Sequence, residues 1–376
     1  MAGRLRVGVI GCGLIAQVMH LHYLRELDDR FEIAALCDLS EEARAFAARE
    51  YGVAEQFASW QELIQRPLDA VIVLTSGSHA PIAIAAAAAG LHVLVEKPMC
   101  FSVVEAQEMI AAAERASTIL MVGYNKRYDP AYVRMLEEKR TLRDLRLLRI
   151  TTLESPIAPY VQHYKLRRGG PLPKPVAESL RADDDARIDG AIPGADPLSR
   201  WAYRYVLLDS LVHELNAMRG ALGEPDRLLF ADIRETGLTA VFKYGTTQCV
   251  LAWVDLPVIA RYEMEFAFYS PERRITLSFP SPFLRSMPST LVLEDGEAES
   301  PVTSRTEVVR SYRESFREEL VHFHECVTTG RTPLTSGVDA MHDIALCEAV
   351  VAVHRNRAAR EHPSKPEMAA TPQAHS

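Results

Sequence analysis

The residues of this chain whose types and positions most clearly suggest chemistry are Glu96 and Lys97, in the run VLVEKPM at residues 93–99. The apolar residues before them are typical of a buried strand, so both side chains are expected at that strand's carboxyl end. The chain opens with RVGVIGCGLIA at residues 6–16, the pattern of a strand, a glycine-rich turn and a helix. A nucleotide-binding turn and a strand-end lysine in one half-domain predict redox chemistry on a nicotinamide cofactor.

The glycine-rich turn contains Gly11, Gly13 and Ala16, which form a G-x-G-x-x-A pattern. The first glycine permits the tight bend, the second lets the backbone approach a pyrophosphate, and the small third residue lets the helix pack on the strand. Asp38 follows about 25 residues later, where a carboxylate can accept hydrogen bonds from the ribose hydroxyls. Because Asp38 would repel the 2′-phosphate of NADP and no arginine follows it directly, NAD is favoured, with NADP possible.

A second group of chemical interest is the pair Asp209 and His213 in LDSLVHELNAMRG, residues 208–220. The segment has a helical pattern, in which residues four apart share one face, and Asn216 falls on nearly the same face. An aspartate that orients an imidazole near a substrate hydroxyl is a device for proton transfer near neutral pH. The alternative is a surface Asp–His pair of little consequence.

The first 125 residues must position the glycine turn and the lysine, and they alternate short apolar runs with helical stretches. Near-continuous apolar strands separated by helices predict a parallel sheet covered on both faces, which is the doubly wound α/β (Rossmann) fold. The expected strands are residues 5–10, 31–37, 70–74, 91–95 and 119–122, and the expected helices include 41–51 and 103–116.

The pattern changes after Asp129 and Pro130, where a short helix at 131–139 and the strand-like LRLLRITTLES follow. Residues 167–197 are polar and rich in glycine and proline, and they predict either a long loop over a site or a partly disordered insertion. Five β-rich runs at 226–294 predict an antiparallel meander with one face buried and the other available for oligomer packing. Helices at 313–329 and 338–354 and a loose tail complete the chain.

Length and composition limit the class of protein. A chain of 376 residues predicts two or three domains, and a net charge of −8 disfavours nucleic-acid or anionic-membrane partners. No apolar run reaches the ~20 residues needed to span a bilayer, and the N-terminus has no secretory leader pattern. The six cysteines form no CxxC pair, so a reduced cytoplasmic protein is expected. The His20/His22 and His322/His324 pairs are spaced i,i+2, which on a helix does not favour a metal site.

Several motifs occur together in an order that resembles the Gfo/Idh/MocA oxidoreductases, the family of glucose–fructose oxidoreductase and inositol dehydrogenase. The resemblance reaches about residue 355 and rests on RVGVIGCGLIA, Asp38, VLTSGSHAPIA, VLVEKP, GYNKRYDPAY, the Asp209/His213 pair and the terminal FREELVHFHECVTTGRTPLTSGVDAMHDIALCEAV. It implies an NAD(P)-binding Rossmann domain at 1–125 and a substrate-binding α/β domain with a large open, mostly antiparallel sheet at 126–355. It also implies homodimers or homotetramers formed through that sheet, with a flexible tail at 356–376.

The resemblance also implies site roles. Lys97 corresponds to a lysine that contacts both the nicotinamide ribose and the reacting hydroxyl, and Asp209 and His213 to the pair that completes a proton relay, with His213 as the base. Asn125 corresponds to the junction between nicotinamide and substrate. His79 either flanks the cofactor or caps the following helix. The expected cofactor-binding set is Gly11, Gly13, Leu14, Ile15, Asp38, Thr75, Ser76, His79, Glu96, Lys97 and Asn125.

The substrate-binding set implied in the same way is Lys97, Asn125, Tyr160, His163, Asp209 and His213. Tyr160 and His163, with Lys165 and Arg167, either enter the pocket or form a solvated turn. Trp201 and Tyr203 are candidates for stacking on a sugar ring or for packing in a core or interface.

Departures from the family pattern concern the pocket wall. Many members carry a glycine-rich run before the aspartate, where this chain has Tyr205-Val206-Leu207-Leu208, and Asn216 stands where aspartate is frequent. The predicted reaction is therefore oxidation of a secondary alcohol of a sugar or cyclitol, with the substrate left open. Two alternatives remain: a redox-neutral NAD-dependent glycosidase or lyase acting through transient oxidation, and a non-catalytic NAD-binding sensor.

Overall fold

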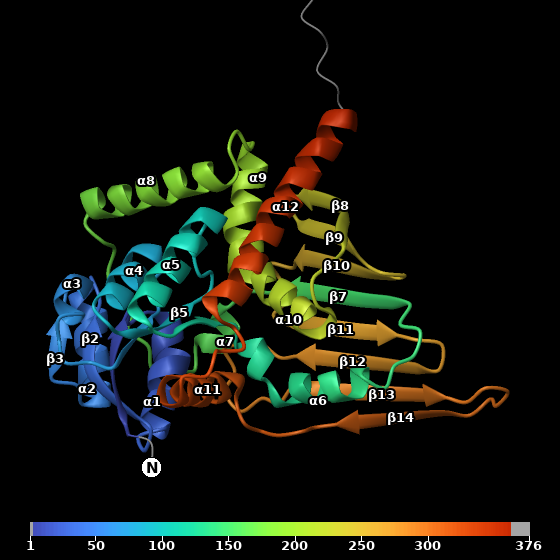
Figure 1. Cartoon of the computed structure of the whole chain (residues 1–376), viewed down its shortest axis with the longest axis horizontal. Coiled ribbons are helices and arrows are strands. Elements are labelled where there is room, and N and C mark those ends of the chain that lie inside the picture. Colours follow the sequence, from blue (N-terminus) through green and yellow to red (C-terminus); the bar gives the residue numbers. More distant parts are fainter. Residues whose placement is uncertain (1–2, 362–376) are drawn as a thin grey trace, which may run out of the picture.

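The computed structural model of the chain describes residues 3–361 and contains two sheets with helices packed around them (Figure 1). The six-stranded sheet has the order β3-β2-β1-β4-β5-β6, and all of its pairs are parallel. This confirms the predicted doubly wound fold. Its strands are β1 (Leu5–Ile10), β2 (Phe31–Cys37), β3 (Glu55–Phe57), β4 (Ala70–Val73), β5 (His92–Glu96) and β6 (Leu120–Gly123).

Helices follow the strands of this sheet as the apolar spacing predicts. Ser40 and Ser102 cap α2 and α5 by accepting from backbone N–H groups three residues on, which fixes where these two helices begin. The helices are η1 (Ala16–His20), α1 (Leu21–Glu26), α2 (Glu41–Tyr51), α3 (Trp60–Leu63), α4 (Ala80–Ala88) and α5 (Val103–Ala116), and η1 is a π-helix.

The second sheet has eight strands in the order β14-β13-β12-β11-β7-β10-β9-β8, and only β7 and β10 pair in parallel. The mostly antiparallel sheet is confirmed, but the simple meander is wrong at its centre. There β7 lies between β10 and β11, strands that the sequence pattern made neighbours. The strands are β7 (Leu147–Glu154), β8 (Arg227–Arg234), β9 (Gly237–Tyr244), β10 (Thr247–Asp255), β11 (Glu263–Tyr269), β12 (Arg273–Phe279), β13 (Thr290–Gly296) and β14 (Thr303–Val308).

The polar segment at 167–197, expected as a loop or disordered insertion, contains the helix α8 (Lys174–Ala191), so that expectation is wrong. Its polar residues are helix-compatible because they pair along and across the helix: Arg187 bonds Asp183 one turn before it and Glu105 on α5. Ile188 is buried and anchors the carboxyl end of α8. In Figure 1, α8 extends beside α4 and α5 of the Rossmann half.

The remaining helices belong to the second half. The expected tail at 356–376 is wrong at its start, because α12 continues to Glu361, and residues 362–376 lie outside the described part. The helices are η2 (Asn125–Tyr128), α6 (Pro130–Lys139), α7 (Ala158–Val161), α9 (Pro197–Trp201), η3 (Ala202–Leu211), α10 (Val212–Leu222), α11 (Ser315–Thr329) and α12 (Gly337–Glu361); η3 is a π-helix.

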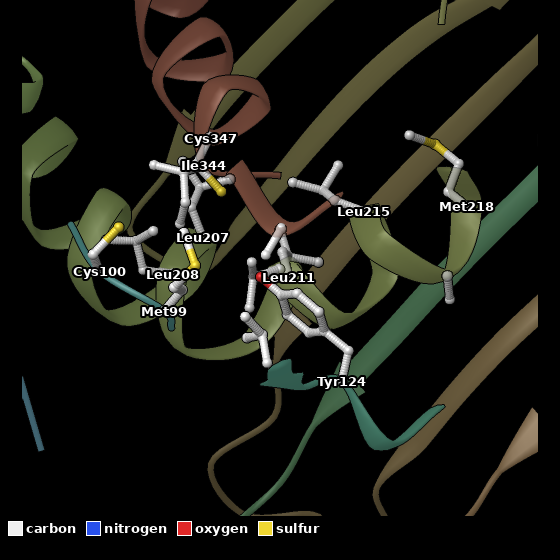
Figure 2. Close-up of a cluster of buried hydrophobic side chains, with 14 of the residues drawn as sticks. Met99, Cys100, Tyr124, Leu207, Leu208, Leu211, Leu215, Met218, Ile344 and Cys347 are labelled. Carbon is white, nitrogen blue, oxygen red and sulfur yellow. The ribbon is translucent and has the colours of Figure 1, made fainter. Parts of the chain in front are cut away.

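A buried apolar cluster fixes η3 and α10 between the two halves (Figure 2). Leu207, Leu208 and Leu211 of η3 lie in it with Met99 and Tyr124 from the Rossmann half. It also contains Leu215, Met218, Ile344, Cys100 and Cys347. Because close-packed side chains resist displacement, the residues on the opposite side of η3 are held in fixed positions.

Two further findings concern the cysteines and the possibility of a membrane-spanning helix. All six cysteines are buried free thiols. Over the described residues, no helix is both long and apolar enough to cross a bilayer.

Candidate functional site

A cavity of about 660 Å³ lies where the carboxyl ends of β1, β4 and β5 face η3, α10 and the second sheet. Open α/β sheets bind their ligands outside the carboxyl ends of the strands, and this cavity has that position. Residues predicted for the site that line it are Gly13, Leu14, Ile15, Thr75, Ser76, Glu96, Lys97, Asn125, Tyr160, Asp209 and His213. Residues predicted for the site that are outside this lining are Gly11, Asp38, His79 and His163.

The glycine turn has the geometry that a dinucleotide requires. Gly11 has φ +100°, and a Cβ there would lie 2.7 Å from the backbone carbon of Leu74, so only glycine fits. Gly13 faces open space, with nothing within 4 Å of the position a Cβ would take. Ala16 is fully buried, as close packing of helix on strand requires. The residues present therefore fit a pyrophosphate at Gly13 and the following helix start.

Asp38 lies beside this turn at the end of β2. Its carboxylate accepts from the backbone N–H groups of Cys12 and Ser40, each at 2.7 Å. These bonds fix the side chain next to the turn. Each carboxylate oxygen has more than one acceptor position, so capacity for ribose hydroxyls remains.

Lys97 follows β5 and reaches across the cavity to η3. Its Nζ donates to the backbone carbonyl of Asp209 at 2.6 Å and to Oδ1 of the same residue at 3.1 Å. Burial alone would lower the pKa of Lys97, but the carboxylates of Asp209 and Glu96 outweigh it and raise that pKa. The side chain is therefore a fixed ammonium group at neutral pH.

His213 lies in the first turn of α10 and lines the same cavity. Burial, then the positive charges of Lys97 and Lys126, lower the pKa of His213 well below 6.5, so the imidazole is neutral at pH 7. Its Nδ1 is buried without a hydrogen-bond partner among the described residues, and Tyr124 meets the ring edge-on at 6.1 Å. A neutral imidazole facing a cavity is available to accept a proton.

The expectation that Asp209 orients His213 through i,i+4 spacing is not met. The described residues give no hydrogen bond or ion pair between the two, and the Asp209 carboxylate accepts from Lys97 instead. The physical reason is the π-helix η3, whose wider turn rotates Asp209 relative to the α-helical His213. Lys97, Asp209 and His213 still share one cavity.

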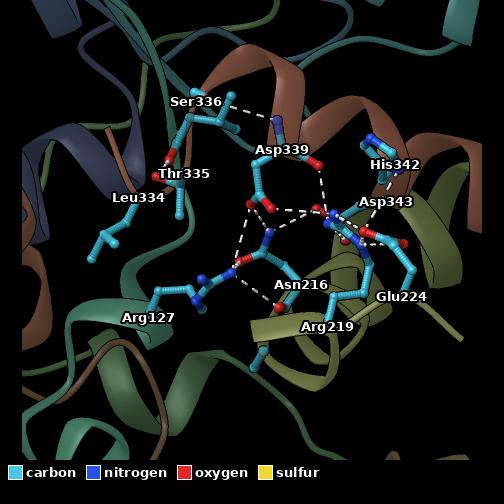
Figure 3. Close-up of polar contacts among 12 residues, drawn as sticks. Arg127, Asn216, Arg219, Glu224, Leu334, Thr335, Ser336, Asp339, His342 and Asp343 are labelled. Carbon is cyan, nitrogen blue, oxygen red and sulfur yellow. Dashed lines mark hydrogen bonds and ion pairs between the residues drawn. The ribbon is translucent and has the colours of Figure 1, made fainter. Parts of the chain in front are cut away.

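Asn216 is directed away from the site, contrary to the helical-face argument. Its Nδ2 donates to Asp339 and Asp343 of α12 at 2.9 and 2.7 Å, and its Oδ1 accepts from Arg127 (Figure 3). Arg219 binds the same two aspartates. Asn216 thus joins α10 to α12 and does not extend the Asp209/His213 group.

His20 lies behind the cavity wall and supports Glu96 and Lys97, a role that sequence reasoning missed. Its Nε2 lies 2.7 Å from Oε1 of Glu96, and the other Glu96 oxygen accepts from the backbone N–H of Lys97 at 3.0 Å. Burial opposes ionisation of Glu96, but the bond to His20 lowers the pKa of Glu96 overall. His20 therefore positions the backbone from which Lys97 extends. A contact between residues 76 positions apart leaves no pattern in the sequence.

His79 is buried behind the cavity wall. Its ring nitrogens lie 2.7 Å from the carbonyl of Pro98 and 2.8 Å from that of Thr75. This side chain joins the loop after β4 to the loop after β5, and its backbone is the N-cap of α4, as the alternative interpretation had it.

The substrate side of the cavity contains some predicted residues and several others. Tyr160 accepts from the backbone N–H of Tyr262 at 2.5 Å, whereas His163 is exposed and stacks on Tyr164. Asn125 donates to Ser315, and its Oδ1 is buried without a partner among the described residues. Lining residues that the sequence did not indicate include Glu154, Ser155, Ser210, Trp253, Tyr262 and Phe283.

Comparison with known proteins identifies the family. Residues 5–124 match the model of the Gfo/Idh/MocA oxidoreductase family's NAD-binding Rossmann fold, and residues 281–360 match the family's C-terminal alpha/beta domain. The chain belongs to the Gfo/Idh/MocA oxidoreductase family. It is accordingly an enzyme of the oxidoreductase class with an NAD-binding Rossmann domain.

Individual members of this family resemble the chain over nearly its whole length. Myo-inositol 2-dehydrogenase of Thermotoga maritima is 28% identical over 345 residues, covering 89% of this chain and 92% of the relative. A 3-ketoreductase from Actinomadura kijaniata, solved with TDP-benzene and NADP, has a TM-score of 0.71 at 20% identity and covers 93% of this chain and 98% of its own. An oxidoreductase from Agrobacterium radiobacter, solved with NAD⁺, L-tartaric acid and magnesium, has a TM-score of 0.71 at 18% identity, with coverages of 94% and 97%.

Proposed function

We propose that this protein is an NAD-dependent dehydrogenase that reversibly oxidises a secondary alcohol of a sugar, glycoside or cyclitol. The observation that carries the proposal is the Lys97 ammonium group, bonded to Asp209 in the cavity that also contains Gly13 and His213. A fixed cation beside a neutral imidazole provides the two groups that alcohol oxidation needs. The substrate class is supported by the inositol dehydrogenase relative.

In this proposal His213 and Lys97 divide the proton chemistry. The neutral imidazole of His213 takes the hydroxyl proton, and Lys97 stabilises the negative charge that develops on the oxygen, an effect worth about 3 kcal/mol in comparable sites. Asp209 keeps Lys97 in place and charged, so it acts through the lysine and not through the histidine. Bound NAD⁺ supplies the hydride acceptor.

The remaining cofactor contacts follow from the turn and its neighbours. Gly13, Leu14 and Ile15 hold the pyrophosphate, and Thr75 and Ser76 line the adjoining wall. Asp38 accepts from the ribose hydroxyls. It favours NAD over NADP, because its half-buried carboxylate repels the 2′-phosphate of NADP. Asn125, with its unpartnered buried Oδ1, lies at the nicotinamide–substrate junction.

A polyol fits the substrate side of the cavity because its walls combine hydroxyl partners with aromatic rings. Glu154 accepts from Ser210 at 3.1 Å and from the Trp253 indole at 3.5 Å, which fixes a carboxylate at the wall. Tyr160 and Tyr262 line the same region. Polar groups that converge in a partly apolar cavity fix the orientation of a small ligand.

The proposal extends to organisation and location. Residues 1–125 bind the cofactor, and residues 126–355 bind the substrate and form a homodimer or homotetramer through the eight-stranded sheet. The acidic net charge argues against nucleic-acid or membrane partners. Six buried free thiols favour the reducing cytoplasm.

The test is formation of NADH, followed at 340 nm, with NAD⁺ or NADP⁺ and a panel of inositols, aldoses, uronates and glycosides. Turnover is expected with NAD⁺ and one substrate class. Lys97→Met should lower kcat about 10²-fold or more, because the half-buried cation is lost while most of the side-chain length is kept. Lys174→Met is the matched control, since the side chain of that lysine is 86% exposed and, within residues 3–361, pairs only with Glu178 on its own helix.

One outcome would contradict the role of Lys97, and two would contradict the dehydrogenase proposal. Equal loss of activity in both lysine variants would remove Lys97 from its role. A flat trace with NAD⁺ bound to the purified protein, together with cleavage of a glycoside without added cofactor, would favour the redox-neutral enzyme. Absence of both activities in NAD-bound protein would favour a sensor.

A further inference from the structure

A second cavity, of about 450 Å³, adjoins the catalytic one. It lies between α8 on one side and α9 and η3 on the other, and Ser76, Arg204 and Tyr205 line both cavities. Because three residues are shared, a single ligand can extend from one cavity into the other. The segment that forms its outer wall, α8, has no other role in the site described above.

An ion pair and a close contact fix α8 next to the loop after β4, which contains Ser76 and Gly77. Asp184 pairs with Arg204 at 2.5 Å, and its Oδ1 lies 2.9 Å from where a Cβ on Gly77 would be. Gly77 has φ +88° and follows Ser76 in the loop after β4, so a larger side chain there would displace α8. The wall of the second cavity is therefore in direct contact with the loop that lines the catalytic cavity.

Two of the three arginines that line the second cavity are paired with aspartates. Arg204 is paired with Asp184, and Arg200 with Asp185 and Asp189. The third, Arg181, is exposed, and no ion pair is found for it among the described residues. Because Arg200 and Arg204 are already bonded to carboxylates, their net attraction for a phosphate is reduced. In these ion pairs the guanidinium N–H groups can still donate to neutral hydroxyl groups, and the carboxylate oxygens of Asp184 and Asp185 can accept from them.

Two exposed aromatic side chains accompany these paired charges. Trp201 is 37% and Tyr205 54% exposed, and the Arg204 guanidinium lies 5.3 Å from the centre of the Tyr205 ring. By contrast, Tyr203 is fully buried and donates to the carbonyl of Phe101, so it belongs to the core. Aromatic faces cover the apolar C–H face of a sugar ring, while its hydroxyls need polar partners around the rim.

We propose that this second cavity is a subsite for a second sugar ring, so that the substrate is a disaccharide or related glycoside whose attached ring contacts Trp201 and Tyr205. The inference rests on the proposed function, because the first ring must occupy the catalytic cavity. It narrows the substrate class to molecules of two linked rings. It also gives α8 a role in specificity.

The kinetic test compares kcat/KM for glucose, methyl glucoside, cellobiose, maltose and trehalose with NAD⁺. At least one disaccharide is expected to exceed glucose by about tenfold or more, which is the gain from one stacked ring. Trp201→Ala should abolish that ratio without changing turnover of the monosaccharide, and Trp201→Phe should restore most of it. Val176→Ala on α8, exposed and outside the cavity lining, is the control and should leave the ratio unchanged.

A binding test separates the inference from the proposed function. Lys97→Met protein loaded with NAD⁺ is titrated calorimetrically with the same sugars, so binding is measured without turnover. Disaccharide binding that Trp201→Ala weakens supports the subsite even where wild-type protein oxidises nothing. Turnover of single and linked rings at equal efficiency, or disaccharide binding unaffected by Trp201→Ala, would overturn the subsite while leaving the dehydrogenase intact. Failure of every disaccharide to bind more tightly than glucose would also overturn it.

Discussion

At the scale of single residues, the protonation state of His213 sets the pH dependence of the proposed reaction. Burial and the charges of Lys97 and Lys126 lower the pKa of His213 well below 6.5. The imidazole therefore stays neutral as pH falls through 6.5, and kcat/KM should keep its plateau there and decline only at lower pH. Lys126→Met removes one of these charges, so the acidic decline should move to higher pH. The measurement is the pH profile of kcat/KM for both proteins.

Two results would contradict this account of His213. One is an acidic decline already centred at or above pH 6.5 in wild type, which would indicate an unperturbed imidazole. The other is an unchanged profile in Lys126→Met. Because folding itself is disfavoured below pH 6.5, where only the unfolded chain protonates this histidine, unfolding should be monitored across the same range.

The individual residues that sequence could predict were those carried by local motifs. Gly13, Thr75, Lys97 and His213 lie in one cavity because each follows a strand end or belongs to the helix expected to face it. Asp209 lines the same cavity, but its partner is Lys97 and not the expected His213, since a π-helical turn has no recognisable pattern in this sequence. His20 and Glu154 could not be found, because their roles depend on contacts between distant parts of the chain.

At the scale of elements, the segment after β7 crosses the cofactor turn and predicts slow release of the cofactor. Gln17 accepts from the backbone N–H of Arg167 at 3.0 Å and donates to its carbonyl at 2.8 Å. Two residues later, a Cβ on Gly169 would lie 2.2 Å from Oγ of Ser40, next to the ribose position. The segment at 167–169 thus contacts Gln17 after the glycine turn and Ser40 after Asp38, on either side of the position expected for the nucleoside.

Gln17→Met should therefore speed NADH release by up to about tenfold. It removes the two hydrogen bonds to Arg167 and a third, at 2.7 Å, to the carbonyl of Cys12 in the glycine turn, each worth about 1 kcal/mol, while keeping the volume of the side chain. The measurement is stopped-flow displacement of NADH, followed by its fluorescence. Arg167→Ala is the control, because it keeps both backbone bonds and should leave the rate unchanged. A release rate in Gln17→Met equal to that of wild type would show that the segment does not retain the cofactor.

Strands could be predicted from sequence where their own residues show that they are buried. Strand order could not be predicted where the paired strands are far apart in the chain. The Rossmann strands are buried on both faces, so each reads as a continuous apolar run such as AVIV of β4. The insertion of β7 between β10 and β11 joins segments about 100 residues apart, which alternation along a strand does not reveal. The edge strand β14, TSRTEV, is almost entirely exposed and polar and gave no apolar signal.

At the scale of the whole molecule, the eight-stranded sheet presents a face that predicts self-association. Helices α6 and α12 pack on this sheet (Figure 1), and along β9 and β10 the residues that alternate with core positions are half-buried or exposed, including Val241, Val250 and Ala252. Val250 lies opposite Val241 on one side and Arg149 of β7 on the other. Half-buried valines beside an exposed arginine in the middle of a sheet are compatible with a surface that another copy covers.

Val250→Arg should therefore convert the assembly to monomers, because a symmetric interface meets each new charge twice and cannot bury it unpaired. Light scattering after size exclusion should give two or four times 41.9 kDa for the wild type and one times that mass for the variant. Val258→Arg is the matched control: that valine is 90% exposed in the loop after β10, so its charge should leave the mass unchanged. A monomeric wild type, or a Val250→Arg protein with the wild-type mass, would exclude this face as the interface and leave the sheet's outer residues without a partner of this kind.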